Sequence, residues 1–360
     1  MMKVPVAILG ATGYVGQRLV SLLADHPYFE IVRLVASPKS AGQSYGQRMA
    51  GNWQLSDCEL PAQLSAAKIY APEPLEEALG PAKLVFSALA MEKDEILKLE
   101  EEIARSERIV LSNNSAHRWT PDVPLLIPEI NAQQLEVLAA QKRRLGTQKG
   151  FIIAKPNCSI QAYVPALTPL LDCGLEEVFV ATYQAVSGAG KRLSDWPEMQ
   201  ENMIPYIGGE EEKSESEPLK VWGQIKAGQI EKAKAPIISA HCCRVAVPEG
   251  HSAVVSFKLK QKLSQAEILD RWAAFNRDLP SLGLPNAPEN FLSYYAEADR
   301  PQAKLDLRSE KGMGISIGRL REDPIFDYKF VCLSHNTLRG AAGGSVLSAE
   351  LLYRLGYFEE

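Results

Sequence analysis

The residues VPVAILGATGYVG, from Val4 to Gly16, decide the fold of the first part of the chain. A short apolar run, Val4–Leu9, leads directly into glycines spaced as GxxGxxG, and an apolar helical pattern follows. This order predicts a strand, a tight turn and a helix whose first backbone N–H groups can approach a pyrophosphate. A turn without a ligand is the alternative, but the motif's position favours nucleotide binding. The residues expected at the nucleotide are Gly10, Thr12, Gly13, Tyr14, Val15 and Gly16.

The first third of the chain continues this alternation of short apolar runs and helical patterns. Its expected elements are Tyr14–Ala24, Glu30–Ala36, Leu84–Ala88, Lys93–Arg105 and Ile109–Ser112. Such βαβ units predict an α/β fold with a Rossmann-like, doubly wound parallel sheet. Between Lys39 and Pro72 the pattern loosens, and we expect irregular structure there.

After Phe151–Ala154 the sequence becomes rich in β-type segments. The expected strands are Val178–Val186, Cys243–Val247, Ala253–Leu259, Ile315–Leu320 and Tyr328–Leu333. They predict a second, α+β domain with a mainly antiparallel sheet. Ser264 and Glu267 form a capping-box signature for one helix, and Gly343–Leu355 should form another that returns to the first domain.

The overall composition favours a small-molecule partner. A length of 360 residues suggests two domains, and 46% hydrophobic with 23% charged residues is typical of globular proteins. A net charge of -5 without basic clusters disfavours nucleic acid and anionic membranes as partners. The six cysteines are too sparse for a disulfide scaffold and suggest no metal site. We find no signal peptide and no membrane span, so the cytoplasm is expected.

The end of the second expected strand indicates which dinucleotide is bound. An NAD site normally carries an acidic residue there, about 20 residues after the glycines. This sequence has Ala36-Ser37-Pro38-Lys39-Ser40 instead, without a carboxylate. Ser37, Lys39 and Ser40 suit a 2′-phosphate, so NADP(H) is the expected cofactor, although a simple polar turn around Pro38 remains the alternative.

Cys158 is the expected nucleophile. It lies in FIIAKPNCSIQ, residues 151–161, between an apolar strand and the expected helix Ala162–Leu171. N–H groups at a helix N-terminus favour a thiolate and can hold an oxyanion. Most free cysteines are small buried apolar residues, and we assign that role to Cys58, Cys173, Cys242, Cys243 and Cys332.

A nucleotide-binding first domain followed by Pro156-Asn157-Cys158 resembles the aspartate-β-semialdehyde dehydrogenase family, in particular its archaeal and fungal branch. The resemblance extends over nearly the whole chain. It implies that Cys158 accepts the acyl group, that His251 in PEGH is the acid/base histidine, and that Gln184 in TYQAVSG orients the substrate. His117 and His241 match no catalytic position.

The same resemblance implies a binding group for each charged end of the substrate. Arg244 in CRVAV would hold the α-carboxylate, Glu210 in GGEEEK the ammonium, and Arg118 with Lys213 the phosphate. Taken singly, Arg244 could be a surface charge and the Glu210–Lys213 run a solvated face. Ala246 stands where the family's motif has proline. Three glutamates, Glu210, Glu211 and Glu212, follow one another, so the ammonium-binding residue could be shifted by one position.

The resemblance also implies further cofactor contacts and a division of the chain. The segment NTLRGAAG, residues 336–343, looks like the family's C-terminal cofactor contact, with Asn336 near the nicotinamide, and Ser87, Ser187 and Gly188 complete the set. Residues 1–157, completed by 336–360, would bind NADP, and residues 158–335 would form a catalytic and dimerisation domain. A homodimer or homotetramer is expected.

The implied activity is the NADPH-dependent conversion of L-aspartyl-4-phosphate into L-aspartate-4-semialdehyde through a Cys158 thioester. Two alternatives remain at this point. One is a related reductase that acts on malonyl-CoA or N-acetylglutamyl phosphate, and the other is a non-catalytic NADP(H) sensor.

Overall fold

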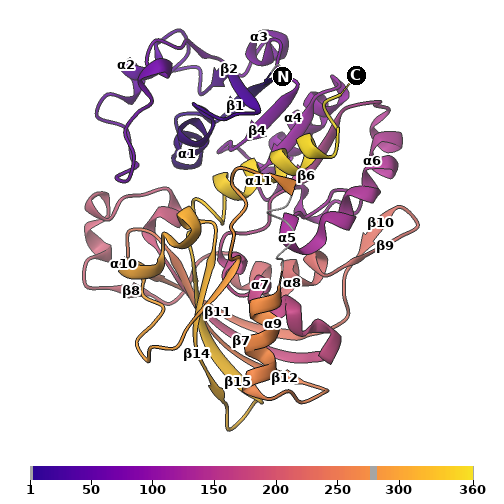
Figure 1. The fold of residues 1–360 in the computed structure, drawn as a ribbon. Coiled ribbons are helices and arrows are strands. Elements are labelled where there is room, and N and C mark those ends of the chain that lie inside the picture. The colour runs from indigo at the N-terminus through magenta and orange to yellow at the C-terminus, as the bar shows by residue number, and fades with distance from the viewer. Residues whose placement is uncertain (1–2, 276–281, 360) are drawn as a thin grey trace.

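The computed structural model describes residues 3–275 and 282–359, which form one large sheet in each half of the molecule (Figure 1). The first sheet has the strand order β3-β2-β1-β4-β5-β6, and all of its neighbouring strands are parallel. This is the order of a dinucleotide-binding doubly wound sheet. Its strands are β1 (Val4–Leu9), β2 (Phe29–Val35), β3 (Ile69–Tyr70), β4 (Leu84–Ser87), β5 (Ile109–Ser112) and β6 (Phe151–Ala154).

Helices cover both faces of this sheet because alternate strand residues point to opposite sides. On one side Ala7, Val85 and Ile152 pack with residues of α3 (Leu75–Leu79), α4 (Lys93–Arg105) and α6 (Leu138–Leu145). On the other side Ile8 and Phe86 pack with α1 (Tyr14–Leu23) and α11 (Ala342–Arg354). The expected α/β, doubly wound architecture is therefore confirmed.

The second sheet has the order β13-β14-β15-β12-β7-β11-β8, and most of its neighbouring pairs are antiparallel. Only β11 with β7 and β13 with β14 run parallel. The strands are β7 (Leu175–Gln184), β8 (Met203–Ile204), β11 (Ile237–Val245), β12 (His251–Leu259), β13 (Leu292–Tyr295), β14 (Ile315–Glu322) and β15 (Tyr328–Ser334).

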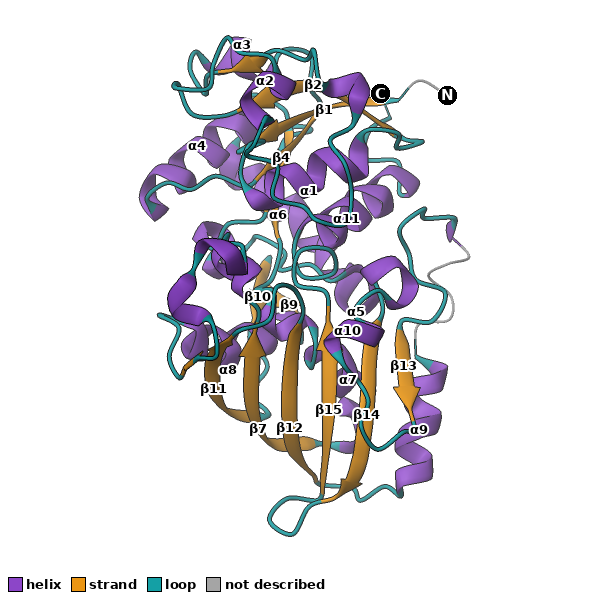
Figure 2. Cartoon of the chain, turned by 90° about the vertical axis from the view of Figure 1, so that its left-hand side faces the viewer, coloured by secondary structure: helices purple, strands orange, loops and turns teal. Residues whose placement is uncertain are grey.

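Helices α7 (Val164–Leu167), α8 (Glu210–Val221) and α9 (Gln265–Ala274) lie on one face of this sheet (Figure 2). Along β11 the side chains alternate between buried and more exposed positions, and Ile237 is 73% exposed. The sheet therefore has one covered face and one face that the described residues leave uncovered, on which β11 exposes Ile237, Ser239 and His241. The remaining short elements are α2 (Tyr45–Met49), α5 (Pro128–Asn131), α10 (Ala303–Asp306) and the hairpin β9 (Gln224–Lys226) with β10 (Gln229–Glu231).

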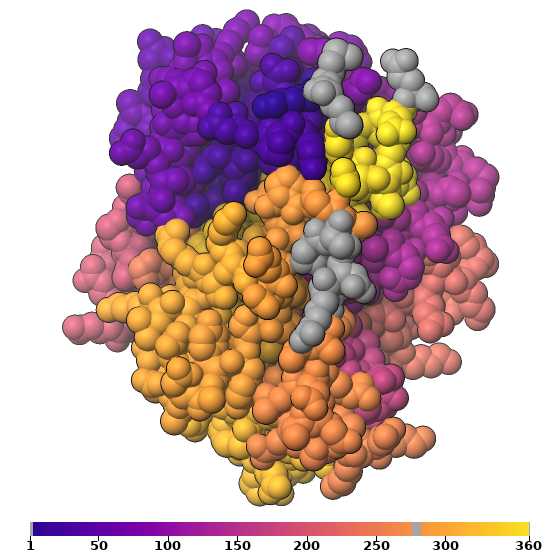
Figure 3. All heavy atoms as spheres, in the orientation of Figure 1, coloured from indigo at the N-terminus to yellow at the C-terminus, as the bar shows by residue number. Residues whose placement is uncertain are grey.

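The two halves share an apolar core and are joined twice by the chain. One core contains Leu9 and Val110 of the first sheet together with Val180 and Phe257 of the second. Figure 3 shows the segment of α11, in yellow, beside the indigo N-terminal part, as expected for a helix that returns to the first sheet. Among the described residues, no helix is long and apolar enough to cross a membrane.

Most expected strands are confirmed within a few residues, and the capping box of Ser264 and Glu267 forms as predicted. The helix expected at Ala162–Leu171 was wrong in part, because α7 is a single turn between the 3-10 segments Ser159–Gln161 and Thr168–Cys173. Prolines at 165 and 169 explain the break, since proline lacks the N–H that a continuous helix needs. Helix α8 was missed, and the region expected to be irregular contains α2 and β3.

Candidate active site

Three side chains of the expected site form one row across neighbouring strands. Arg244 on β11 pairs in register with Gln184 on β7, and Gln184 pairs with His251 on β12. Residues at one register of adjacent strands point to the same face of a sheet. Strand pairing therefore places the three side chains together, and all three are buried. Ala246 follows the end of β11, so the departure from proline there lies outside the strand that carries Arg244.

Cys158 reaches this row from the first half of the molecule. It follows β6 and begins the 3-10 turn Ser159–Gln161, and its Sγ lies 3.4 Å from Nε2 of His251. Nδ1 of His251 accepts a hydrogen bond of 3.0 Å from the backbone N–H of Ala185. Because Nδ1 is an acceptor, the proton of the neutral imidazole belongs on Nε2, where it faces the sulfur.

The environment favours the neutral forms of both groups. The pKa of the Cys158 thiol is raised to about 12, mainly by burial and next by the carboxylate of Glu210. The pKa of His251 is lowered to about 3, mainly by burial and next by the guanidinium of Arg244. The expectation that a helix N-terminus would favour the thiolate was wrong, because one 3-10 turn follows the sulfur and burial has the larger effect.

Glu210 contacts this group from the start of α8. Its Oε1 accepts hydrogen bonds from Asn157 Nδ2 at 2.9 Å and Lys213 Nζ at 2.8 Å, and its Oε2 accepts one from Gln184 Nε2 at 3.2 Å. Burial acts to raise its pKa, but the ion pair with Lys213 and these hydrogen bonds outweigh burial, and the net pKa is lowered. Glu210 therefore remains a carboxylate beside the sulfur. The neighbouring Glu211 instead accepts from the backbone N–H of Cys242, and Glu212 is exposed.

Arg118 lies against the same helix, but two turns farther along it. Its NH1 donates to Oε1 of Glu217 at 2.8 Å, and both side chains are buried. Lys213 binds Glu210 instead, and its side chain is 30% exposed. The two cations expected at the phosphate are thus held by two different carboxylates of α8.

Arg244 is buried without such compensation. Its NH1 donates to the backbone carbonyl of Ala185 at 2.7 Å, and it forms no ion pair within residues 3–275 and 282–359. Gly188 is needed beside it, because a Cβ at this position would lie 2.8 Å from Arg244 NH1 and 2.9 Å from His251 Nε2. The site therefore contains a buried guanidinium that forms no salt bridge among the described residues, although the carboxylate of Glu210 acts on its charge from farther away.

The glycine loop between β1 and α1 has the features that a dinucleotide site requires. Gly10 has a φ of +79°, and a Cβ there would collide with the carbonyl oxygen of Ala88. No side chain caps the N-terminus of α1, and no acidic residue lies in its first turn. The N–H groups are therefore available to an anion, which fits the pyrophosphate of NADP(H).

The residues expected at the 2′-phosphate follow β2 on the surface. Ser37 and Lys39 are exposed, whereas Ser40 is buried and its Oγ accepts a hydrogen bond of 2.9 Å from Arg48 Nε. Arg48 belongs to α2, a helix that was not predicted from the sequence. The capping residues Ser44 and Gln47 were the signal that could have revealed α2, because each caps the other's backbone N–H.

The other expected cofactor contacts are already bonded within the chain. Ser87 is buried at the end of β4, where its Oγ accepts from Asn114 Nδ2 at 3.0 Å. Asn336 Nδ2 donates to Ser187 Oγ at 2.9 Å, and Asn336 Oδ1 accepts from the N–H of Gly250 at 2.8 Å. Asn336 thus joins the loop after β7 to the loop before His251, and its amide is not free.

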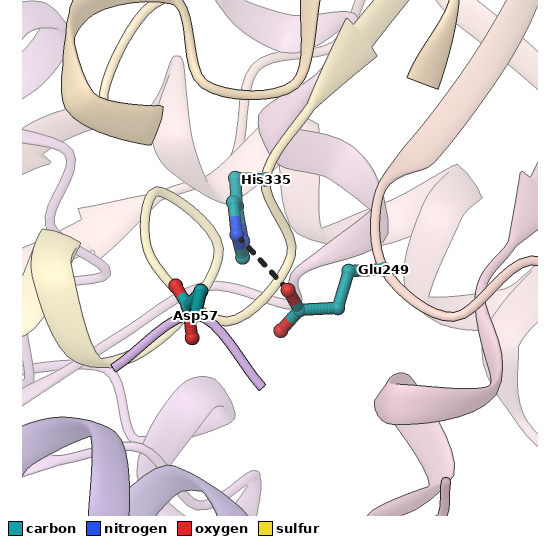
Figure 4. Close-up of side chains that lie close together, drawn as sticks. All are labelled: Asp57, Glu249 and His335. Atoms are coloured by element: carbon teal, nitrogen blue, oxygen red, sulfur yellow. Dashed lines mark ion pairs between the residues drawn. The ribbon is translucent and has the colours of Figure 1, made fainter. Parts of the chain in front are cut away.

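A network of charges ties the glycine loop to the loop before His251. Glu249 accepts hydrogen bonds from Tyr14 and Arg18, each at 3.1 Å. Figure 4 shows Asp57, Glu249 and His335 close together, with an ion pair of 3.5 Å between His335 and Glu249. Arg18 also pairs with Asp57 at 2.6 Å, so cations of the chain balance these carboxylates.

The sequence is matched by two family models. Residues 5–138 match "Semialdehyde dehydrogenase, NAD binding domain", and residues 167–339 match "Semialdehyde dehydrogenase, dimerisation domain". The chain is 42% identical over 353 residues to the aspartate-semialdehyde dehydrogenase of Methanothermobacter thermautotrophicus, covering 97% of this chain and 99% of that protein. It belongs to the aspartate-semialdehyde dehydrogenase family. The family resemblance inferred from the Pro-Asn-Cys junction is therefore confirmed.

Members of this family from fungi are similar over the same length. The enzyme from Saccharomyces cerevisiae is 38% identical over 361 residues, which cover 96% of each chain. The structure of the aspartate-semialdehyde dehydrogenase from Candida albicans with NADP superposes with a TM-score of 0.86 at 33% identity, covering 99% of this chain and 100% of that one. The fold and the cofactor-binding domain agree with those expected from the sequence.

Proposed function

We propose that this protein catalyses the NADPH-dependent reductive dephosphorylation of L-aspartyl-4-phosphate to L-aspartate-4-semialdehyde, a step of amino-acid biosynthesis. The observation that carries the proposal is the contact of 3.4 Å between Cys158 Sγ and His251 Nε2, beside a buried arginine and a buried carboxylate. Family membership and the names of the relatives support it.

In the first half-reaction, the Cys158 sulfur attacks the acyl carbon and forms a C–S bond, and the bond to the phosphate oxygen breaks. The Nε2–H of His251 stabilises negative charge that develops on the sulfur. The departing phosphate takes up the thiol proton and lies near Arg118 and Lys213. Pairing of the substrate ammonium with Glu210 would also cancel the charge that raises the pKa of Cys158, so substrate binding favours the thiolate.

In the second half-reaction, NADPH supplies the hydride that reduces the thioester. The chain's own contribution is to stabilise the resulting oxyanion, for which the Nε2–H of His251 and the backbone N–H groups near Cys158 are available. Collapse breaks the C–S bond, releases the aldehyde and leaves Cys158 as a thiolate, which takes up a proton from solvent to restore the thiol that the first half-reaction deprotonated. Gln184 keeps Glu210 and the substrate in place throughout, because it hydrogen-bonds the carboxylate.

Arg244 and Glu210 support an amino acid as the substrate. Arg244 complements an α-carboxylate, and Glu210 complements an α-ammonium. Neither malonyl-CoA nor N-acetylglutamyl phosphate carries an ammonium, and the names of the relatives do not favour these substrates.

We propose that Gly10, Thr12, Gly13, Tyr14, Val15 and Gly16 hold the pyrophosphate and that Ser37, Lys39, Ser40 and Arg48 hold the 2′-phosphate of NADPH. Ser87, Ser187, Gly188 and Asn336 would line the nicotinamide end. Residues 1–157 with 336–360 would form the cofactor-binding domain, and residues 158–335 the catalytic domain. The uncovered face of the second sheet supports a homodimer or homotetramer, and the six free cysteines agree with a cytoplasmic location.

The deciding experiment is the reduction of NADP⁺ by the purified protein with aspartate semialdehyde, with and without inorganic phosphate. Activity that requires phosphate supports the proposal, and activity independent of phosphate contradicts it. Cys158→Ala should abolish turnover while NADPH still binds, as measured by quenching of cofactor fluorescence. Near-normal turnover in this variant would exclude the thioester mechanism.

A further inference from the structure

Helix α8 presents four polar side chains to the site, from residues 210, 213, 217 and 220. Spacings of three, four and seven place them along one face of the helix. Glu210 and Lys213 belong to the chemistry proposed above. Glu217 and Lys220 are only 0% and 2% exposed, and that chemistry does not use them. A buried carboxylate is costly unless it is well paired, so its partners indicate what it does.

Glu217 uses its two oxygens on two different parts of the site. Oε1 accepts the hydrogen bond of 2.8 Å from Arg118 NH1, and Oε2 accepts one of 2.7 Å from the backbone N–H of Asn157. Asn157 immediately precedes the nucleophile Cys158. One rigid carboxylate therefore connects the guanidinium expected at the phosphate to the peptide unit beside the sulfur.

Lys220 holds the same segment through its backbone. Its Nζ donates to the carbonyl oxygens of Arg118 at 2.7 Å and Thr120 at 2.8 Å. Arg118 is thus fixed by α8 at both its main chain and its side chain.

The remaining edge of the Arg118 guanidinium has no strong partner. Nε is buried without an acceptor, and NH2 has one long contact of 3.5 Å to the carbonyl of Asn113. A planar guanidinium that is anchored through NH1 and keeps Nε and NH2 available is arranged to bind an oxyanion with two parallel hydrogen bonds.

We propose that Glu217 is a positioning residue, which sets the place of the phosphate-binding guanidinium of Arg118 relative to the sulfur of Cys158. The inference rests on the proposed function and adds a residue to it. Glu217 also balances the charge of Arg118. The phosphate therefore meets an ion pair with little net charge, which permits its release in each turnover.

Glu217→Gln is the sharpest test because it keeps the shape of the side chain. A glutamine has one acceptor oxygen, and its NH2 group faces a donor, so it can keep only one of the two bonds. We expect the KM for phosphate to rise about tenfold or more, and the KM for aspartate semialdehyde to change by less than about twofold. Glu215→Gln is the matched control, because Glu215 lies on the same helix and accepts from the backbone N–H of Ala240 instead.

A double-mutant cycle separates positioning from a purely structural role. If Glu217 acts through Arg118, the rise in phosphate KM caused by Glu217→Gln should disappear in an Arg118→Met background. Adding Glu217→Gln to Arg118→Met should then not raise the phosphate KM further. Additive effects, or an unchanged phosphate KM in a folded Glu217→Gln protein, would overturn the proposal. Glu217→Asp, which keeps the charge but is too short for both bonds, should shift the phosphate KM in the same direction and serves if the glutamine variant does not fold.

A binding measurement keeps this test independent of turnover. Inorganic phosphate should slow the alkylation of Cys158 by iodoacetamide, and Glu217→Gln should raise the phosphate concentration required about tenfold. Protection that shifts in this way without any phosphate-dependent turnover would refute the proposed function alone. If turnover depends on phosphate but Glu217→Gln needs the same phosphate concentration to protect Cys158 from alkylation, only the role of Glu217 would be refuted.

Discussion

The two buried arginines of the site, Arg118 and Arg244, carry the same charge in opposite settings. Arg118 pairs with the carboxylate of Glu217 at 2.8 Å. Arg244 donates to the carbonyl of Ala185 and forms no ion pair among the residues that the structure describes. Burial lowers the pKa of Arg244, as expected for a cation that gives up water.

This difference matches what each arginine is expected to bind. A buried cation without a carboxylate in direct contact gains most from a ligand carboxylate, so Arg244 suits the substrate group that stays bound through both half-reactions. A compensated guanidinium gains less, so Arg118 suits the phosphate that must leave.

Replacing Arg244 should have the largest effect. Arg244→Met should lower kcat/KM for aspartate semialdehyde about 100-fold or more, the loss typical of an unpaired buried charge partner. Arg244→Lys should recover only part of it, because an ammonium cannot form two parallel bonds to a carboxylate. Steady-state kinetics with saturating phosphate would measure both, and a loss below about threefold would contradict the proposed carboxylate site.

The same change at Arg118 should act on the other substrate. Arg118→Lys should raise the KM for phosphate roughly tenfold and leave the KM for aspartate semialdehyde within about twofold. Initial rates at varied phosphate give this number. If the aspartate semialdehyde KM changed more than the phosphate KM, the assignment of the two arginines would have to be exchanged.

The charge of Glu210 acts on the Cys158 thiol, so removing it should have two effects. Glu210→Gln should weaken the binding of aspartate semialdehyde. It should also lower the pKa of Cys158, because the carboxylate contributes to raising that pKa to about 12. Alkylation of the thiol at one fixed alkaline pH should therefore become several-fold faster. Glu211→Gln should leave the alkylation rate unchanged. If Glu211→Gln accelerated alkylation as much as Glu210→Gln, the ammonium-binding residue would have to be reassigned from Glu210 to Glu211.

The charge of Arg244 also reaches His251, and this predicts a pH dependence of stability. With a pKa of about 3, His251 stays neutral in the folded protein. In the unfolded chain it takes up a proton near its usual value of about 6.5, so stability is lost as the pH falls below that value. His251→Gln should reduce this acid-side loss, measured by urea denaturation at neutral and acidic pH. An identical pH dependence in both proteins would argue against a neutral buried imidazole.

We expect the smallest mutational effect at a third arginine, Arg48. Its side chain is only partly buried, so solvent screens its interaction with the cofactor phosphate. Arg48→Met should raise the KM for NADPH by about threefold to tenfold and leave activity with NADH unchanged. Kinetics with both cofactors would test this, and an equal loss with NADH would remove Arg48 from the 2′-phosphate site.

The first sheet could be predicted well from the sequence because its signals are local. The run Val4–Leu9, the glycines that follow it and the pattern of Lys93–Arg105 fix short elements through their own periodicity, and the structure places them at these bounds. The row of Arg244, Gln184 and His251 depends instead on the pairing of three strands. No periodicity in one segment specifies that pairing, so only the family resemblance could bring these residues together.

The parts that were missed are those set by tertiary contacts. Glu217 and Lys220 read as members of a polar, charged run and are nevertheless almost fully buried, because the segments of Arg118 and Asn157 cover them. The pKa of Cys158 was misjudged for a similar reason, since burial by distant segments outweighs the local turn. Local sequence thus predicted which groups are present, but not how each is charged or covered.

The return of α11 to the first sheet has a consequence for how the chain matures on the ribosome. Ala342, Val346 and Leu351 share a core with Ile8 and Phe86, although the ribosome makes the first group long after the second. The nucleotide-binding half therefore cannot close its core as it emerges, and its apolar face stays exposed until residues 342–354 are made. We expect this half to fold together with the rest, which leaves the nascent chain dependent on protection against aggregation until then.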